Sequence, residues 1–313
     1  MQIALQALLL AGGLALAIAA SDVAVSNTRA LAAAFGAPAF VVGVALVSIG
    51  TDLPEIANSI AAHVQGEGDV NVGDSVGSTL TQYTLVMGVF PAVVAVIAVQ
   101  RRQAVVVSLL TCAGLGLTIW FVSDGWLGRA EGAVLVGAWA VFTVVAVRLV
   151  GGTVPDDPPA GVGRSKALQV GIVLVALAVV GLGATVAVRA LVKLARLAGV
   201  PEFVIAFFGA SLGTSAPELA VDVTALVRGS PGIALGDAMG SSLVDSTLSI
   251  GAGPLVEPAS VTPGLAVRGS VYSLVAIAAV GTVLAVRRRL DRRASVVLLG
   301  LYALSYVVLL RAV

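Results

Sequence analysis

Apolar residues form ten long stretches along the chain, separated by short polar segments. The stretches cover residues 2–20, 37–63, 69–99, 103–122, 127–149, 167–189, 201–227, 231–257, 268–287 and 294–312. Because a helix needs about 20 apolar residues to cross the hydrocarbon core of a bilayer, each stretch predicts a transmembrane helix. The pattern therefore predicts an all-α polytopic membrane protein with ten transmembrane helices.

The composition agrees with this class and excludes others. Of the 313 residues, 58% are hydrophobic and only 11% are charged, whereas soluble domains carry about 25% charged residues. A net charge of +1 argues against a nucleic-acid-binding chain.

Single residues exclude two further kinds of site. The chain has one cysteine, Cys112, which excludes an internal disulfide. It has one histidine, His63, which excludes a His-rich metal site and which we expect at the membrane interface. The first stretch has no basic segment before it, so we interpret it as a spanning helix and not as a cleaved signal peptide.

The two halves of the chain repeat one another at an offset of 163 residues. Segments 50–88 and 213–251 align without a gap and share 16 of 39 residues, including Pro54 with Pro217 and Glu55 with Glu218. A polar linker at 151–166, with three prolines and two aspartates in its middle, separates the first five-helix repeat (1–150) from the second (167–313). Because five is odd, the second repeat must enter the membrane from the opposite face. This predicts two inverted five-helix repeats, an architecture of secondary transporters.

The distribution of positive charge predicts the orientation. Of the 18 Lys and Arg residues, twelve fall in loops on one side of the predicted bundle, among them the cluster at 287–293, and six fall on the other side. Since positively charged loops stay in the cytoplasm, we expect the richer side and the linker inside the cell and both termini outside.

Four predicted helices, the second, third, seventh and eighth, carry polar residues at one-turn spacing. Such spacing places oxygen-bearing side chains on one face of each helix. Pro54 and Pro217 have no N–H for the carbonyls four residues earlier, so both helices should bend there. The four stripes consist of Ser48, Thr51, Asp52 and Glu55; of Asp74, Ser78 and Gln82; of Ser211, Thr214, Ser215, Glu218 and Asp222; and of Asp237, Ser241 and Asp245.

Seven of the 17 acidic residues lie in the interior of these four apolar stretches, away from their ends, and no Lys or Arg lies at a similar depth. Ionisable residues at the bilayer centre are costly and usually functional. Carboxylate, hydroxyl and amide oxygens without thiols or imidazoles are the ligands that Ca²⁺ prefers, and Na⁺ binds oxygen ligands as well. The position of Asp222 leaves open whether it lines the pathway or faces an aqueous vestibule.

The two repeated motifs resemble a known family. GTDLPE at 50–55 and GTSAPE at 213–218, each followed by G-D-x-x-G-S, are similar to the two alpha-repeats of the cation/calcium exchanger superfamily, in particular to its short prokaryotic sodium/calcium exchangers. The resemblance implies alternating access and an integral protein of a prokaryotic cell membrane. By position it implies two central glutamates, Glu55 and Glu218; ligands farther along the next helices, Gln82 and Asp245; hydroxyl ligands Thr51, Ser78, Thr214, Ser215 and Ser241; and backbone carbonyls near Ser48 and Ser211.

Three acidic residues depart from the family pattern. Asp52 stands where the family commonly has serine, and Asp74 and Asp237 replace a common asparagine. We include all three among the candidate cation ligands. They bear on the coupling ion, because crowded carboxylates repel one another and a bound proton relieves that repulsion.

The expected function is therefore secondary active antiport of Ca²⁺ for Na⁺, with inorganic cations and the lipid bilayer as partners. No enzymatic activity, cofactor or obligate protein partner is implied. The alternative is a Ca²⁺/H⁺ or other cation/H⁺ antiporter. A remote alternative is an intramembrane aspartyl protease, since residues 234–237 come near the Gly-x-Gly-Asp pattern of such enzymes, but Ala234 replaces the first glycine and the partner Tyr-Asp motif is absent. A passive channel is a further alternative, which a far higher flux would reveal.

Overall fold

The computed structural model describes residues 2–150, 165–197 and 215–310, and these are almost entirely helical. The predicted linker, except for its last two residues, lies outside the described residues. So do the first part of the stretch at 201–227 and the end of the last stretch.

The first half of the chain contains eight α-helices, two π-helical turns and two short strands within the described residues. They are α1 (Gln2–Phe35), α2 (Ala39–Val42), η1 (Gly43–Val47), α3 (Ser48–Thr51), α4 (Leu53–Val64), α5 (Gly68–Thr81), η2 (Gln82–Val86), α6 (Met87–Val93), β1 (Val96–Ala98), α7 (Arg101–Val122), β2 (Trp126–Leu127) and α8 (Arg129–Val150).

The described part of the second half repeats much of this order. It consists of α9 (Lys166–Leu197), α11 (Ala216–Val227), α12 (Pro231–Val244), η3 (Asp245–Ser249), α13 (Ile250–Val256), β3 (Ala259–Ser260), α14 (Pro263–Arg287), β4 (Arg289–Asp291) and α15 (Arg292–Leu310).

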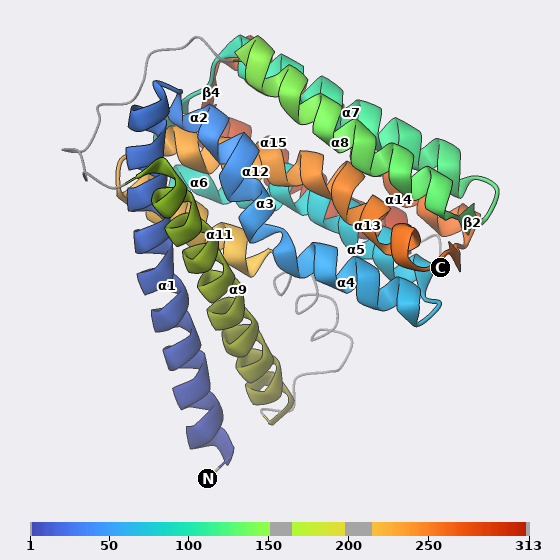
Figure 1. The fold of residues 1–313 in the computed structure, drawn as a ribbon, viewed down its shortest axis with the longest axis horizontal. Helices are drawn as coiled ribbons and strands as arrows, with labels where there is room; N and C mark the ends of the chain where they lie inside the picture. The colour runs from blue at the N-terminus through green and yellow to red at the C-terminus, as the bar shows by residue number, and fades with distance from the viewer. Residues whose placement is uncertain (1, 151–164, 198–214, 311–313) are drawn as a thin grey trace.

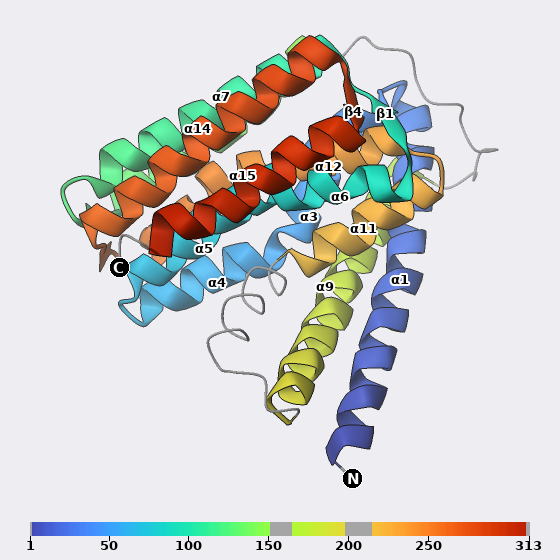
Figure 2. The same ribbon diagram turned by 180° about the vertical axis from the view of Figure 1, so that it is seen from behind.

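Helices α1 and α9 lie side by side and are inclined steeply to the other long helices (Figures 1 and 2). They approach closely at Gly13 and Gly183, where an added Cβ would lie 2.7–2.8 Å from backbone atoms of the facing helix. At the centre of the fold is α12, in which every residue from Ile233 to Val244 is buried. A helix buried on all sides has no lipid-facing or water-facing stripe, so its polar residues face other protein groups.

Several helices are suited to a membrane. Among the described residues, α1, α7, α8, α9 and α14 are long and apolar enough to cross it, and the bent pair Ala39–Thr51 with Leu53–Val64 would be a sixth span. The π-helical turns η2 and η3 divide two further stretches into shorter helices, of which the longest, α5 and α12, have 14 residues each. The chain is thus an all-helical integral membrane protein with several apolar spans, and the number ten stays a prediction.

Several predicted boundaries were wrong, among them the end of the sixth stretch, where α9 continues past residue 189 to Leu197, and two of the differences have a visible cause. The first helix does not end at residue 20 but continues to Phe35, because its polar residues Ser21 and Thr28 are buried against the bundle. The third stretch leaves the helix at Val93, soon after Pro91, and its last residues form β1 instead. The hydrophobic pattern alone does not show whether a polar residue ends a helix or lies on a buried helix face. It also does not distinguish a short apolar strand from a continuing helix.

Two antiparallel strand pairs join loops of the two halves. Strand β1 pairs with β4, with Val96 opposite Asp291, and β2 pairs with β3, with Trp126 opposite Ser260. Asp291 makes several hydrogen bonds at the pair of β1 and β4. Its carboxylate accepts hydrogen bonds from the backbone N–H of Ala294 (3.0 Å) and from Arg287 (2.7 and 2.9 Å).

Replacing Asp291 by Asn is expected to lower the melting temperature at neutral pH. The backbone N–H of Ala294 and the guanidinium of Arg287 hold the pKa of the Asp291 carboxyl below its usual range. A lowered pKa contributes stability that is fully present above the unfolded value of about 3.9 and is lost as pH falls through the folded value. Thermal melting of the detergent-purified protein should therefore separate native and variant at pH 7 and bring them together in strong acid, whereas Glu67→Gln should differ at neither pH.

Candidate cation-binding site

The helix that carries Glu55 is broken beside it. Helix α3 ends at Thr51, Asp52 leaves the helical conformation (φ −81°, ψ 3°), and α4 begins at Leu53 after a bend of 44°. Pro54 lies in the first turn of α4, where backbone N–H groups have no partner within the helix, so a proline costs no hydrogen bond there. The bend predicted from Pro54 is confirmed, and its cause is visible in the position of the proline.

The second copy of the motif is built in the same way where the structure describes it. Helix α11 begins at Ala216, directly after Ser215, with Pro217 and Glu218 in its first turn. Both glutamates thus lie at a helix N-terminus, where unpaired N–H groups and the helix dipole stabilise negative charge. The predicted ligands Ser211 and Thr214 lie outside the described residues.

Three carboxylates meet at the centre. Asp52, Glu55 and Glu218 each place one carboxylate oxygen so that all three oxygens lie within 4.8 Å of one another. Their side chains are between 0 and 2% exposed. Because Ca²⁺ binds oxygens at about 2.3–2.6 Å, oxygens that share one ion lie up to about 5 Å apart. The three groups can therefore hold a single cation.

Hydroxyl groups connect this triad to α12. The hydroxyl of Thr51 lies 3.2 Å from Asp237 Oδ1 and 3.3 Å from Ser241 Oγ. These three residues are buried, so the structure brings predicted ligands from α3 and α12 into direct contact. Ser48, by contrast, donates to the carbonyl of Val44 within its own helix (2.8 Å).

The remaining predicted ligands differ in their surroundings. Gln82 and Asp245 begin the π-helical turns η2 and η3, and both are buried. Gln82 Oε1 and Asp245 Oδ2 have no hydrogen-bond partner among the described residues. Such turns widen a helix locally and are frequent at functional sites. Ser78 is buried on α5, whereas Asp74 is only half-buried and accepts a hydrogen bond of 2.6 Å from Asn58.

Asp222, whose role the sequence left open, belongs to the buried set. It is 0% exposed, and neither of its carboxylate oxygens has a hydrogen-bond partner among the described residues. The spacing of four residues between Glu218 and Asp222 places both on one face of α11, and this is the sequence feature that indicated Asp222. In this structure the Asp222 side chain therefore faces protein and not water.

Among the described residues, the buried negative charge has no buried Lys or Arg as a partner. Six carboxylates are fully or almost fully buried, and no Lys or Arg is buried in the described residues. The segment 198–214 contains no Lys, Arg or His that could supply one. Since an unpaired buried charge is costly, the cluster requires bound cations or protons. The six are Asp52, Glu55, Glu218, Asp222, Asp237 and Asp245.

Known proteins with similar sequences are membrane antiporters or membrane proteins. The putative antiporter CaxA of Alkalimonas amylolytica is 29% identical, over 84% of this chain and 85% of its own length. The inner membrane protein YrbG of Escherichia coli is 28% identical, over 82% and 81%. The sodium/calcium exchanger MaX1 of Methanosarcina acetivorans is 26% identical, over 81% and 84%.

The fold is also that of a solved exchanger. The sodium-calcium exchanger NCX_Mj, soaked with 10 mM Na⁺ and no Ca²⁺, superposes with a TM-score of 0.78 at 22% identity, over 97% of this chain and 99% of that one. The sequence profile described as sodium/calcium exchanger protein matches twice, at residues 5–148 and 168–311. These two matches span nearly the full length, and the chain belongs to the sodium/calcium exchanger family.

Proposed function

We propose that the protein is a secondary antiporter that exchanges Ca²⁺ for Na⁺ across the membrane by alternating access. The observation that carries the proposal is the buried triad of Asp52, Glu55 and Glu218, with one oxygen of each within 4.8 Å of the others. Membership of the exchanger family supports cation antiport and leaves the protease alternative without support. The protein then acts as a transporter and not as an enzyme.

Exchange follows from shared negative charge. Glu55 and Glu218 coordinate Ca²⁺ together with Asp52, and the surrounding ligands complete the shell. When Ca²⁺ leaves, the same carboxylates accept Na⁺, because a site emptied of all cations leaves several carboxylates uncompensated in a medium of low dielectric constant. One set of ions therefore excludes the other, and sodium entering down its gradient drives calcium out. The surrounding ligands are Thr51, Ser78, Gln82, Thr214, Ser215, Asp237, Ser241 and Asp245, with carbonyls near Ser48 and Ser211 and with Asp74 farther out.

The access mechanism we propose uses two inverted five-helix repeats, residues 1–150 and 167–313, with ten spanning helices. Four pairs of elements, from α4 with α11 to α6 with α13, have boundaries that differ by 163 residues throughout. Both ends of the second family match lie 163 residues after those of the first. The hydroxyl of Ser242 also donates to the carbonyl of Thr79, its partner at the same offset (3.3 Å). These observations support a two-fold relation whose axis passes through the site.

We also propose that the end with β1 and β4 is cytoplasmic and that both termini lie outside a prokaryotic cell membrane. This end carries seven arginines against the single acid Asp291 within residues 94–102 and 286–294, as the positive-inside rule requires. A cysteine introduced near the N-terminus should react with a membrane-impermeant thiol reagent on intact cells. Reaction only after lysis would reverse the orientation.

Equilibrium binding of radioactive Ca²⁺ to the detergent-purified chain tests the shared site. We expect bound Ca²⁺ to be displaced by Na⁺ with a steep concentration dependence, since more than one monovalent ion is needed to replace one divalent ion. K⁺ or choline at the same ionic strength serves as the control for screening. Displacement by all three salts alike would mean that Na⁺ does not compete for the site.

One observation favours proton coupling as the second candidate. Asp52 adds a third carboxylate beside Glu55 and Glu218, and neither of its oxygens has a hydrogen-bond partner among the described residues. A proton on one of three crowded carboxylates lowers their repulsion.

Replacing Asp52 by Ser is expected to leave Ca²⁺ uptake driven by a sodium gradient largely intact in reconstituted vesicles. Serine, which the family commonly has at this position, keeps an oxygen ligand there, and the two glutamates that are equivalent in the two copies, Glu55 and Glu218, remain to neutralise Ca²⁺. If protons are the coupling ion, native vesicles respond to an imposed pH gradient instead, and the substitution abolishes that response. Equal stimulation by both gradients in native vesicles would contradict exclusive coupling to sodium.

A further inference from the structure

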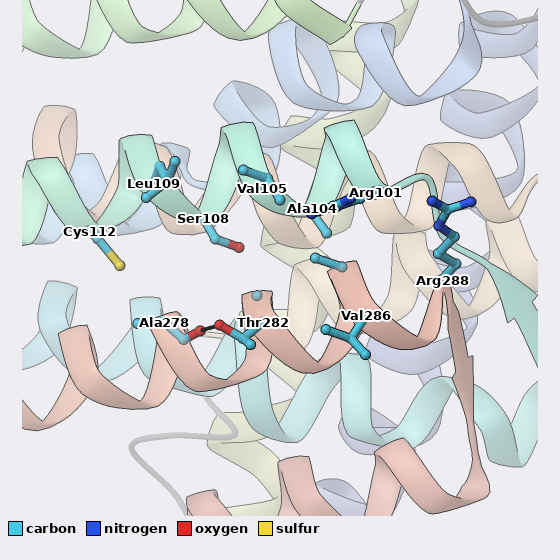
Figure 3. A pocket seen from close by; sticks show the side chains of 12 residues that line it. Arg101, Ala104, Val105, Ser108, Leu109, Cys112, Ala278, Thr282, Val286 and Arg288 are labelled. Carbon is cyan, nitrogen blue, oxygen red and sulfur yellow. Dashed lines mark hydrogen bonds between the residues drawn. The ribbon is translucent and has the colours of Figure 1, made fainter.

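Helices α7 and α14 border a pocket on the outside of the bundle (Figure 3). It has a volume of about 550 Å³. Its walls are mostly apolar, and the side chains of Val105, Leu109 and Val286 are 36, 64 and 77% exposed. In a membrane-spanning helix such exposed apolar groups face lipid, so the pocket opens toward hydrocarbon.

Two arginines stand at one end of this pocket. Arg101 is the first residue of α7 and Arg288 directly follows α14, and both lie at the same end in Figure 3. Neither is paired with an acidic group among the described residues. Asp291, the only acid in the neighbouring loops, is bonded to Arg287 and Arg289 instead. The end of the pocket therefore carries positive charge that no acidic group of the described residues neutralises.

The pocket has a fixed floor and a defined length. At Gly281 an added Cβ would lie 2.5–2.6 Å from the side chain of Ser108, so the two helices touch there, and Ser108 donates to the hydroxyl of Tyr83 (3.2 Å). From Arg101 to Cys112 the helix rises by about 16 Å. This is close to half of the roughly 30 Å hydrocarbon core, which is the depth of one leaflet.

We propose that this pocket binds an anionic phospholipid, with its phosphate between Arg101 and Arg288 and one acyl chain lying along α7 and α14 toward Cys112. Arginine pairs bind phosphate oxygens through parallel, charge-assisted hydrogen bonds. Because the pocket opens toward hydrocarbon, its apolar walls favour a phospholipid, which carries an acyl chain, over a water-soluble phosphate compound as the occupant. The site is separate from the cation site and does not depend on the proposed exchange.

Native mass spectrometry of the full-length protein tests the charge requirement. Phosphatidylglycerol and phosphatidylcholine of identical chain length are titrated into the detergent-purified chain. We expect tighter binding of phosphatidylglycerol, weakened about 30-fold by Arg101→Gln with Arg288→Asn, since each arginine near an anionic lipid surface contributes about fivefold. Asparagine is chosen because Arg288 has φ +52°, which asparagine tolerates.

Arg268→Gln is the matched control, because Arg268 is exposed on the same helix α14 but near its other end. It should bind phosphatidylglycerol as the native protein does. Equal affinity for the two lipids, or equal affinity of the double variant and this control, would overturn the proposal.

Cys112, the only cysteine in the chain, reports where the acyl chain lies. Phosphatidylglycerol should slow alkylation of Cys112 by N-ethylmaleimide in the native protein and not in the double variant. Ala278→Phe, which fills the pocket without touching the arginines, should also weaken phosphatidylglycerol binding. An arginine-dependent binding that neither protects Cys112 nor responds to Ala278→Phe would place the lipid at the surface and contradict the pocket.

Discussion

Replacing Glu218 by Gln is expected to reduce the initial rate of Ca²⁺ uptake into reconstituted vesicles by two orders of magnitude or more. Glu218 is fully buried and contributes one of the three oxygens that meet within 4.8 Å. Removing one partner of a buried charge interaction costs about 3–5 kcal/mol, which corresponds to a loss of more than 100-fold. Glu55→Gln removes the equivalent group of the first copy and should have a similar effect.

The control for both variants is Glu67→Gln. Glu67 is exposed at the turn between α4 and α5, so the substitution removes the same charge outside the site and should leave the rate unchanged. If Glu55→Gln and Glu218→Gln both purify as folded protein and keep more than a small fraction of native uptake, the assignment of the central ligands is wrong.

Replacing Gly43 by Val is expected to destabilise the folded protein by about 3 kcal/mol, at the upper end of what overpacking of a core costs. An added Cβ at Gly43 would lie 2.8 Å from the carbonyl oxygen of Ile233 and 2.9 Å from the backbone nitrogen of Asp237. These are backbone atoms of the central helix α12, so no side-chain movement relieves the overlap. The melting temperature in detergent should fall strongly, and Asp237 should shift away from Thr51.

Gly137→Val is the matched control for this substitution. Gly137 is exposed on α8, and an added Cβ there meets no atom within 4 Å. It carries the same penalty for a β-branched residue in a helix and lacks the contact with α12. Similar melting temperatures for the two variants would show that the contact between η1 and α12 is not a tight one.

The sequence was sufficient to predict the helical membrane class and most helix positions. Long apolar stretches leave few alternatives to spanning helices, and Pro54 identified the break beside Glu55. What it could not predict are features set by partners distant in the chain. The pairing of β1 with β4 depends on residues nearly 200 positions apart. His63, expected at the membrane interface, is buried, and its ring lies 2.8 Å from the carbonyl oxygen of Glu257, 194 positions away.

The sequence was sufficient to predict which residue types form the candidate site, but not which of them lie next to one another in space. One-turn spacing placed Asp52 and Glu55 on one face, and the repeat pointed to Glu218, yet only the folded arrangement brings the three oxygens together. Spacing left Asp222 open, because a carboxylate one turn beyond Glu218 faces either the protein or water. Its burial depends on packing between α11 and its neighbours. The same holds for Asp74 and Asp237, which are equivalent in sequence but differ in exposure.

The most direct test of the proposed exchange is uptake of radioactive Ca²⁺ into vesicles that contain only this protein. Vesicles are loaded with Na⁺ and diluted into either the same Na⁺ concentration or an equal concentration of K⁺, at one pH on both sides. We predict rapid uptake only when Na⁺ is higher inside, and its collapse when a sodium ionophore removes the gradient. Uptake that is equal in the two dilutions, or that appears only when a pH gradient is imposed, would contradict exchange of Ca²⁺ for Na⁺.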